Sequence, residues 1–338
     1  MSQLTGTGVR VVASIDELGP AEWERLAGRA PVFYRYDFLR SVETSPLSRP
    51  SAAHYLVTED ASGRLAAAMV LYLQETVDPF ATGGDGRPER MLTGHVWHCY
   101  DTVVLSAAPL APAVVTAFCD AMHALADELG AGPRGLVNVA WGGPLAAALT
   151  AAGLPAQETT PRYRLTVPPG GITREAHLAT VGRSSRRTLG RYWRRALRAG
   201  VRVRFDEGRR VLDDEVLELC RATADKHAPG YYPPVELSAL IDRLGPACRL
   251  LRVELDGVLL AVSICLLDEG RAHFWAGGCR YPAELNWSPQ YVLFAAELEA
   301  GLASGRPVVE FGRRNDEFKR RYGLAPVRLG RFVSGGAR

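Results

Sequence analysis

The chain is 338 residues long, which is more than one average domain needs and suits two. Hydrophobic residues make up 47% of it and charged residues 23%, which is typical of a soluble globular protein. The net charge is only +3, which excludes nucleic-acid binding through overall charge. Any affinity for RNA must come from local clusters of basic side chains, and no DNA partner is expected.

The sequence predicts neither a membrane anchor nor a secreted protein. The longest apolar runs are far shorter than the roughly 20 residues that a membrane helix needs. Residues 1–6 lack the basic region and apolar core of a secretory signal. The cysteines are scattered and form no CxxC pair: Cys99, Cys119, Cys220, Cys248, Cys265 and Cys279. We therefore expect a cytoplasmic protein with reduced thiols.

The first half is expected to alternate strands and helices. Ser14 and Glu17 have capping-box spacing at the first helix, and Gly130 ends the longest one. The expected elements are a strand at 9–13, helices at 14–26 and 33–42, a hairpin at 54–73, a strand at 96–105, a helix at 111–129, a strand at 136–140, a helix at 144–152 and a strand at 163–167. A Pro/Gly-rich linker at 167–171 follows, so the predicted domains are 1–167 and 172–338.

The second half repeats this order of elements without a residue-level repeat. The expected elements are a helix at 173–199, a strand at 201–205, helices at 213–226 and 234–244, a hairpin at 249–267 around Asp256-Gly257, a strand at 271–277, a helix at 288–303, and strands at 307–311 and 327–333. This order predicts an α/β (α+β) fold rather than a Rossmann sheet. Each domain would hold a mixed, mostly antiparallel, curved sheet flanked by helices.

A short segment after the buried strand at 307–311 contains the most informative motif. Phe318-Lys319 is followed by Tyr322-Gly323, on a short helix that begins near Asp316. Together with the order of elements, this motif resembles the Fem-like (FemAB/FemX-type) tandem GNAT acyltransferases, including the FemAB-like GNAT acetyltransferases. The match covers most of residues 170–333, and residues 9–167 only in element order.

The resemblance implies transfer of an amino acid from aminoacyl-tRNA to an amine, with Lys319 beside the reacting carbonyl. Elementary chemistry agrees, because aminolysis passes through an oxyanion, and a fixed donor there contributes about 3–4 kcal/mol. Phe318 is then expected to contact substrate and Asp316 to accept the amine proton. The alternative is that Lys319 is one of three consecutive basic residues on a solvated surface.

An arginine stripe is expected on the helix at 173–199. Arg183, Arg187, Arg191, Arg194 and Arg198 fall on one helical face. Leu189, Trp193 and Leu197 fall on the other and are expected to pack on the sheet. Such a stripe suits the phosphates of a tRNA acceptor stem or of a nucleotide-linked precursor. The alternative is a solvated helix that is partly neutralised by acidic neighbours such as Glu207, Asp213 and Glu215.

The expected acyl donor depends on whether the sequence contains a turn that binds the pyrophosphate of CoA. Acetyl-CoA-dependent GNAT enzymes cradle a pyrophosphate in a Gly-rich turn before a helix. The corresponding stretch at 277–289 has no such glycine spacing beyond Gly277-Gly278, and Glu284 would repel a phosphate. We therefore expect no bound cofactor and aminoacyl-tRNA as co-substrate, with acetyl-CoA or another acyl-CoA as the alternative.

Weaker candidates complete the expected site. Tyr231, Tyr232 and Tyr281 are expected to contact substrate, the first two because the corresponding region of a GNAT fold forms the acceptor wall. His98 and Asp101 are candidates at a cleft between the domains. The spacing of His95, His98 and Cys99 on a strand does not converge on one point, so no metal site is predicted.

The sequence thus predicts an acyltransferase that forms an amide (peptide) bond. The acceptor would be the amine of a small metabolite or of a cell-wall precursor. Two alternatives stay open: an acyl-CoA-dependent GNAT N-acetyltransferase, and a non-catalytic module that binds RNA or a precursor.

Overall fold

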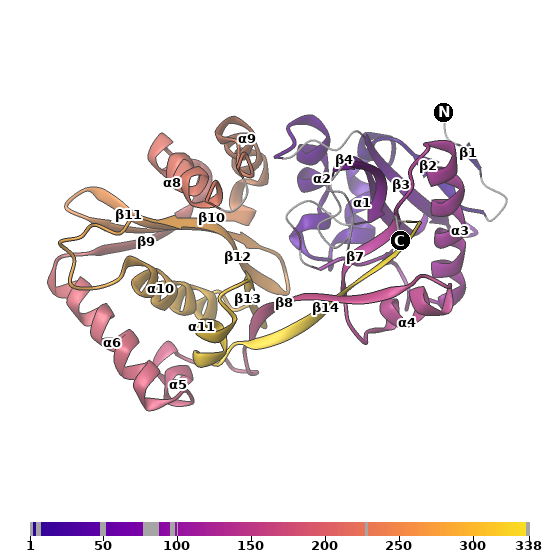
Figure 1. Ribbon diagram of the computed structural model, residues 1–338. Helices are drawn as coiled ribbons and strands as arrows, with labels where there is room; N and C mark the ends of the chain where they lie inside the picture. The colour runs from indigo at the N-terminus through magenta and orange to yellow at the C-terminus, as the bar shows by residue number, and fades with distance from the viewer. Residues whose placement is uncertain are drawn as a thin grey trace. The chain divides into compact units, whose positions relative to one another are not determined.

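The computed structural model describes residues 3–4, 8–47, 52–76, 88–94, 99, 101–226 and 229–335 (Figure 1). These residues form two compact units. The first contains residues 1–161 and 327–338, and the second contains residues 162–326. Among the described residues, every helix is too short or too polar to cross a membrane.

The first unit is a mostly antiparallel sheet covered by helices. Its strands, in sheet order, are β1 (Gln3–Leu4), β2 (Arg10–Val12), β3 (Ala52–Glu59), β4 (Leu65–Thr76), β5 (Glu89–Gly94) and β7 (Arg134–Ala140), with β6 (Leu105–Ser106) beside β4. Its helices are η1 (Ile15–Glu17), α1 (Pro20–Ala27), η2 (Val32–Tyr34), α2 (Tyr36–Thr44), α3 (Pro112–Glu128) and α4 (Pro144–Ala151). Only β5 and β7 pair in parallel among these strands.

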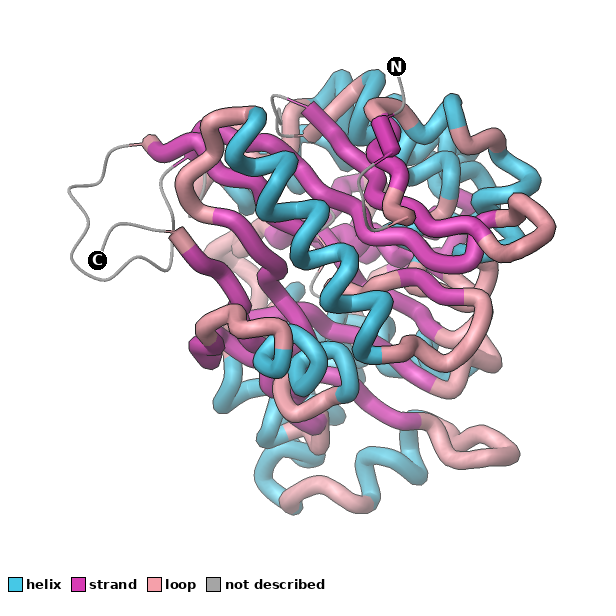
Figure 2. The backbone as a smooth tube through the Cα atoms, turned by 90° about the vertical axis from the view of Figure 1, so that its right-hand side faces the viewer, coloured by secondary structure: helices cyan, strands magenta, loops and turns pink. Residues whose placement is uncertain are grey.

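Helix α3 shows how the sequence builds this unit. Val115, Phe118, Cys119 and Met122 follow helical spacing and are all buried, so one face of α3 packs on the sheet. Figure 2 shows α3 lying across the strands. Of the strand expected at 96–105, the described residues form one bridge, between Thr102 and Val139, and the start of β6.

The last strand of the chain belongs to the first unit from residue 327 onward. In β14 (Ala325–Ser334), residues Leu329 to Ser334 pair antiparallel with β7, and Phe332 packs on Trp141 with ring centroids 6.0 Å apart. This differs from the expected division, which placed 172–338 in one domain, because strand pairing over long sequence distances does not show in local patterns. β8 (Ala156–Thr166) runs from the first unit into the second.

The second unit is a second mixed sheet. Its strands, from one edge, are β9 (Arg202–Glu207), β10 (Cys248–Leu255), β11 (Val258–Leu267), β12 (Arg271–Cys279), β13 (Val308–Arg313) and the end of β8. Its helices are α5 (Arg174–Ala179), α6 (Arg183–Arg198), α7 (Gly208–Val211), α8 (Asp214–Ala224), α9 (Pro234–Leu244), η3 (Gly245–Ala247), α10 (Pro289–Ala303) and α11 (Asp316–Arg321). The expected hairpin turn at Asp256-Gly257 is present, and both residues have positive φ.

The two parallel strands β12 and β13 separate after a short contact. Their pairing covers only Arg271–His273 and Val308–Glu310. Beyond this point β12 continues alongside β11, while no described strand pairs with the edge that faced β13. Gly278 allows α8 to pack closely on this part of β12, since a Cβ there would lie 2.3 Å from the Leu219 carbonyl oxygen. The separation opens a space at the carboxyl ends of both strands.

The helix expected at 173–199 is two helices, because the chain breaks between α5 and α6. Thr173 caps α5 by accepting a hydrogen bond from the Ala176 N–H. On α6 the buried side chains are Ser185, Leu189 and Ala196. The expectation that Leu197 packs on the sheet is wrong: it is 50% exposed, since it lies one position beyond the buried face.

Substitution of Phe332 tests whether the last strand packs in the core of the first unit. Its side chain is fully buried in the core of the first unit, so Phe332→Ala should lower the free energy of unfolding by about 3–5 kcal/mol, measured by urea denaturation. Arg328→Gln is the control on the same strand, because it removes an exposed ion pair with Glu158 and a contact over the Trp141 ring but no buried side chain, and it should cost much less than Phe332→Ala. Equal losses from both variants would contradict this packing.

Candidate active site

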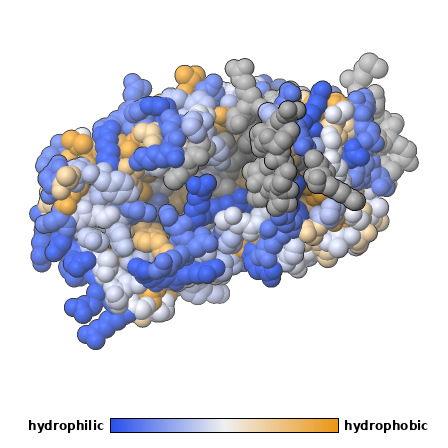
Figure 3. All heavy atoms as spheres, in the orientation of Figure 1, coloured by the Kyte–Doolittle hydropathy of each residue, from blue (hydrophilic) through white to orange (hydrophobic). Residues whose placement is uncertain are grey.

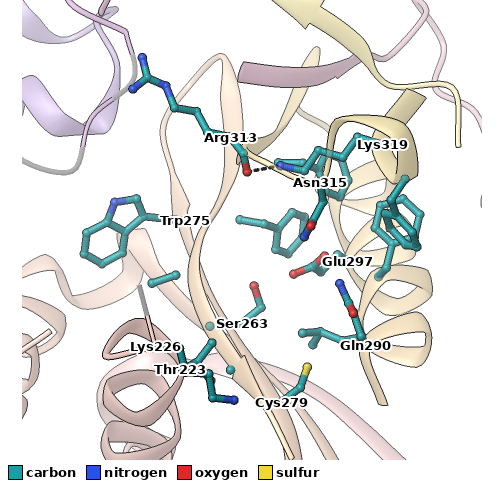
Figure 4. Close-up of a pocket in the computed structure, with 18 of the residues that line it drawn as sticks. Thr223, Lys226, Ser263, Trp275, Cys279, Gln290, Glu297, Arg313, Asn315 and Lys319 are labelled. Carbon is teal, nitrogen blue, oxygen red and sulfur yellow. Dashed lines mark hydrogen bonds between the residues drawn. The ribbon is translucent and has the colours of Figure 1, made fainter. Parts of the chain in front are cut away.

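The second unit contains a cavity of about 520 Å³ where β12 and β13 separate. Side chains with polar atoms line it from several elements and are labelled in Figure 4: Thr223, Lys226, Ser263, Trp275, Cys279, Gln290, Glu297, Arg313, Asn315 and Lys319. Aromatic rings complete the wall: Phe274, Phe294, Phe311 and Phe318. A cavity of this size with apolar walls and a few polar groups is typical of a ligand site.

The ammonium group of Lys319 is bound to backbone carbonyls at the end of β13. Its Nζ donates hydrogen bonds to the carbonyl oxygens of Gly312, at 3.0 Å, and Arg313, at 2.7 Å, the second of which is drawn in Figure 4. The turn between β13 and α11 brings these carbonyls back toward the helix. Arg314 and Asn315 both have positive φ there. Residues other than glycine rarely adopt this backbone conformation, and it is often found at functional sites.

Burial changes the acidity of Lys319. The side chain is only 8% exposed, and the loss of hydration lowers the pKa of its ammonium to about 8. The negative charges of Glu297, Asp316 and Glu310 oppose this decrease. An ammonium with this pKa is still mostly protonated at pH 7, so it can donate a hydrogen bond to an anion.

Glu297 is the acidic residue of the cavity wall that sequence reasoning missed. It lies on α10, and burial raises the pKa of its carboxyl to about 7, while a hydrogen bond with Ser263 and the charge of Lys319 act in the opposite direction. A signal existed in the sequence. Gln290, Phe294 and Glu297 follow helical spacing and share one face, so a carboxylate stands on the apolar side of a buried helix.

Three of the predicted residues line the cavity. They are Lys319, Phe318 and Tyr281. Phe318 also packs on Phe294, with ring centroids 4.9 Å apart, and Tyr281 donates a hydrogen bond to the Gln290 Oε1 atom at 3.3 Å. The motif identified in the sequence therefore places both a cation and an aromatic ring at the cavity.

The remaining predicted substrate and base residues lie elsewhere among the described residues. Tyr232 is buried against the ring of Trp275, behind the cavity wall, and Tyr231 packs on Tyr232. Asp316 lies near Tyr163, where its negative charge helps to raise the pKa of the Tyr163 hydroxyl. Asp101 is buried in the first unit. His98, like His95, lies outside the described residues, so the structure does not place it.

The arginine stripe is exposed along α6. Arg183, Arg187, Arg191 and Arg194 line a shallow hollow of about 650 Å³ together with two hydroxyl side chains of the same helix. Hydrophilic surface covers α6 at the lower left of Figure 3. Among the described residues, no carboxylate pairs with these four arginines or with Arg198.

Three of the acidic residues that follow the stripe in sequence are paired with other arginines. Asp213 accepts a hydrogen bond from Arg252 at 2.7 Å, Glu207 forms ion pairs with Arg209 and Arg210, and Glu215 forms one with Arg280. These three carboxylates therefore do not neutralise the stripe.

A series of packed aromatic rings connects the arginine stripe to the cavity wall. Arg191 stacks on Tyr192 at 5.1 Å, and the rings of Tyr192 and Tyr291 are 4.9 Å apart. Tyr291 in turn contacts Phe318, with centroids 5.3 Å apart, in the cavity wall. Arg195 adds a hydrogen bond to the Asn286 carbonyl oxygen at 2.7 Å, which holds the loop before α10.

Residues 183–320, which include the cavity and the stripe, match the family model of the acetyltransferase (GNAT) domain. This match identifies residues 183–320 as a GNAT domain and the protein as an acyltransferase. Its fold is similar to that of FemX, with a TM-score of 0.63 and 12% identity over 92% of this chain and 95% of that one. The expected resemblance to the Fem-like tandem GNAT proteins is thus confirmed for the fold, and so is the predicted fold class.

Two further solved structures are similar in fold to this chain. A tandem GNAT protein from the clavulanic acid biosynthesis pathway, solved without AcCoA, has a TM-score of 0.57 and 15% identity over 98% of this chain and 99% of that one. L-PGS from Bacillus licheniformis has a TM-score of 0.51 and 14% identity over 83% of each chain. No curated protein matches the sequence.

The two perturbed groups of the cavity give a direct pH test. We expect the Glu297 carboxyl to titrate with a midpoint near 7 and the Lys319 ammonium near 8, because burial penalises the charged form of each. Carbon-13 NMR of labelled glutamate and lysine would measure both midpoints, with Glu297→Gln and Lys319→Met used to assign the signals. Midpoints at the ordinary values of exposed side chains would mean that the cavity does not desolvate either group.

Proposed function

We propose that this protein forms an amide bond by transferring an aminoacyl group from aminoacyl-tRNA to the amine of a small metabolite or cell-wall precursor. The observation that carries the proposal is the position of Lys319: a buried, hydrogen-bonded ammonium in the wall of a cavity that an arginine stripe approaches. The GNAT domain and the FemX-like fold support an acyl transfer.

Lys319 is suited to bind the oxyanion of this reaction. The acceptor nitrogen attacks the ester carbonyl carbon, a C–N bond forms, and the carbonyl oxygen becomes negative. An ammonium has three N–H donors, and two of those of Lys319 are used by the Gly312 and Arg313 carbonyls. The third is left for the oxyanion. Collapse of the intermediate then breaks the C–O bond and releases the 3′-terminal hydroxyl of the tRNA.

The arginine stripe is suited to an extended polyanion. From Arg183 to Arg198 the helix rises roughly 22 Å, at about 1.5 Å per residue, so the guanidinium groups are spread along a line. A nucleic-acid backbone presents its phosphates in the same way, and unpaired arginines bind them with the release of counterions. The stripe belongs to the same unit as Lys319, so donor phosphates and reacting ester could be held by one domain.

The loop before α10 lacks the features that usually bind a CoA pyrophosphate. Residues 280–288 before the helix contain no glycine, Glu284 is exposed in this loop, and Pro289 has no N–H to donate at the first position of α10. These features support a donor whose phosphates are bound by side chains instead.

An acyl-CoA-dependent N-acyltransferase is the second candidate, and one observation favours it. Within the described parts of the chain, no strand pairs with the cavity-facing edge of β12 beyond His273, so its backbone could pair with an extended amide-containing chain. The matched family model is that of an acetyltransferase domain. This candidate shares the oxyanion chemistry and differs in the donor.

A coupled assay separates the candidates. We would incubate the protein with a synthetase-charged tRNA pool and a panel of amines, and detect amides by mass spectrometry. Lys319→Met should lower turnover at least about a hundredfold with little change in melting temperature, since it removes a donor to the oxyanion. RNase should abolish the product. Product formed from acetyl-CoA and resistant to RNase would replace the tRNA donor by CoA. Full activity of Lys319→Met would remove the proposed role of this lysine.

The stripe can be tested by the salt dependence of donor binding. Arg187→Gln combined with Arg191→Gln should weaken tRNA binding and reduce the slope of log K against log[salt] by about 2, because two phosphate contacts are lost. Arg209→Gln combined with Arg210→Gln is the matched control, since those arginines are exposed but already paired with Glu207. The same slope for both pairs would show that the stripe is an ordinary solvated face.

A further inference from the structure

We propose that Glu297 is the general base of this acyltransferase and that the acceptor enters the cavity as an ammonium ion. The proposal rests on the proposed function. It assigns the proton acceptor, for which the sequence pointed to Asp316, to a different element of the fold. It also limits the acceptor to amines that are protonated at neutral pH.

The geometry selects Glu297 over other acids. Among the described residues that line the cavity, Glu297 is the only carboxylate. It comes from α10, on the same helical face as Gln290 and Phe294, and in Figure 4 it stands between Ser263 and the Lys319 helix. Asp316 is not among the described residues that line the cavity.

Glu297 and Lys319 are near enough to influence each other but are not an ion pair. Each changes the pKa of the other through its charge, while the described residues include no ion pair between them. The hydrogen bonds of Lys319 go to two backbone carbonyls, and the carboxyl of Glu297 has Ser263 as its partner. Glu297 and Lys319 are thus held by separate partners, and both line the same cavity.

The other titratable groups near Glu297 do not compete for the proton. From β11 and β12, the thiols of Cys265 and Cys279 interact with its charge, and burial raises the pKa of both, that of Cys279 to about 12. They therefore stay neutral at physiological pH. Lys226 lines the cavity from the end of α8 and carries a positive charge. Among the described lining residues, Glu297 is thus the carboxylate that is placed to take up a proton near pH 7.

The proton transfers balance with this assignment. The carboxylate of Glu297 takes one proton from the acceptor ammonium, which leaves a neutral amine with a free electron pair. The nitrogen attacks the carbonyl carbon, and Lys319 binds the resulting oxyanion. The second proton leaves the nitrogen as the C–O bond breaks and is taken by the departing oxygen. A base with a pKa near the operating pH is efficient in such a step, and that of Glu297 is about 7.

A comparison of two amines, one of which needs no base, tests whether Glu297 is the general base. Hydroxylamine is uncharged at neutral pH, whereas methylamine is protonated. With the donor that the wild type uses, Glu297→Gln should lower methylamine turnover at pH 7 at least about a hundredfold. It should leave hydroxylamine turnover within about threefold. Lys319→Met should lower both. Glu299→Gln is the control from the same helix, because Glu299 is exposed and pairs only with Arg174, and it should change neither rate.

A second variant covers the case in which Glu297→Gln fails to fold. The hydrogen bond of Ser263 lowers the pKa of Glu297, so Ser263→Ala should move the acid limb of the methylamine profile to higher pH and leave the hydroxylamine profile unchanged. Equal losses with both nucleophiles in Glu297→Gln, or no loss with either, would overturn the base assignment. A wild type that forms neither product from any donor would overturn the proposed function, and the role of Glu297 with it.

Discussion

The site depends on one interaction: the ammonium of Lys319 bound to two carbonyl oxygens at the end of β13. Desolvation makes a buried cation costly, and these hydrogen bonds offset part of that cost. They also fix the position of the charge, since the lysine ties its own helix back to the preceding strand. Arg314 and Asn315, both with positive φ, form the turn between this strand and the helix of the lysine.

The cavity changes the acidity of two groups in opposite directions. The same loss of hydration lowers the pKa of Lys319 and raises that of Glu297, so both pKa values lie close to neutral pH. A cation that can stabilise negative charge and a carboxylate that can accept a proton then coexist over a narrow pH range. Such a pair is the arrangement that acyl transfer to an amine requires.

The sheet makes room for this chemistry by separating two of its strands. Because β12 and β13 pair over only three residues each, a cavity opens at their carboxyl ends. Helix α10 closes one side and supplies Glu297, while α11 supplies Lys319 and Phe318. The unpaired arginines of α6 lie in the same unit, joined to the wall by the rings of Tyr192 and Tyr291.

The sequence by itself determined what depends on neighbours along the chain. The tandem element order, the Asp256-Gly257 turn, the place of Lys319 after a buried strand and the single arginine face of α6 all follow from local spacing. The tertiary structure decided what depends on distant residues. The pairing of β14 with β7, the approach of Glu297 on α10 to Lys319 on α11, and the exposure of Leu197 result from packing between segments far apart in sequence. Local periodicity shows which face of a helix is apolar, but only the completed sheet determines which groups that face meets.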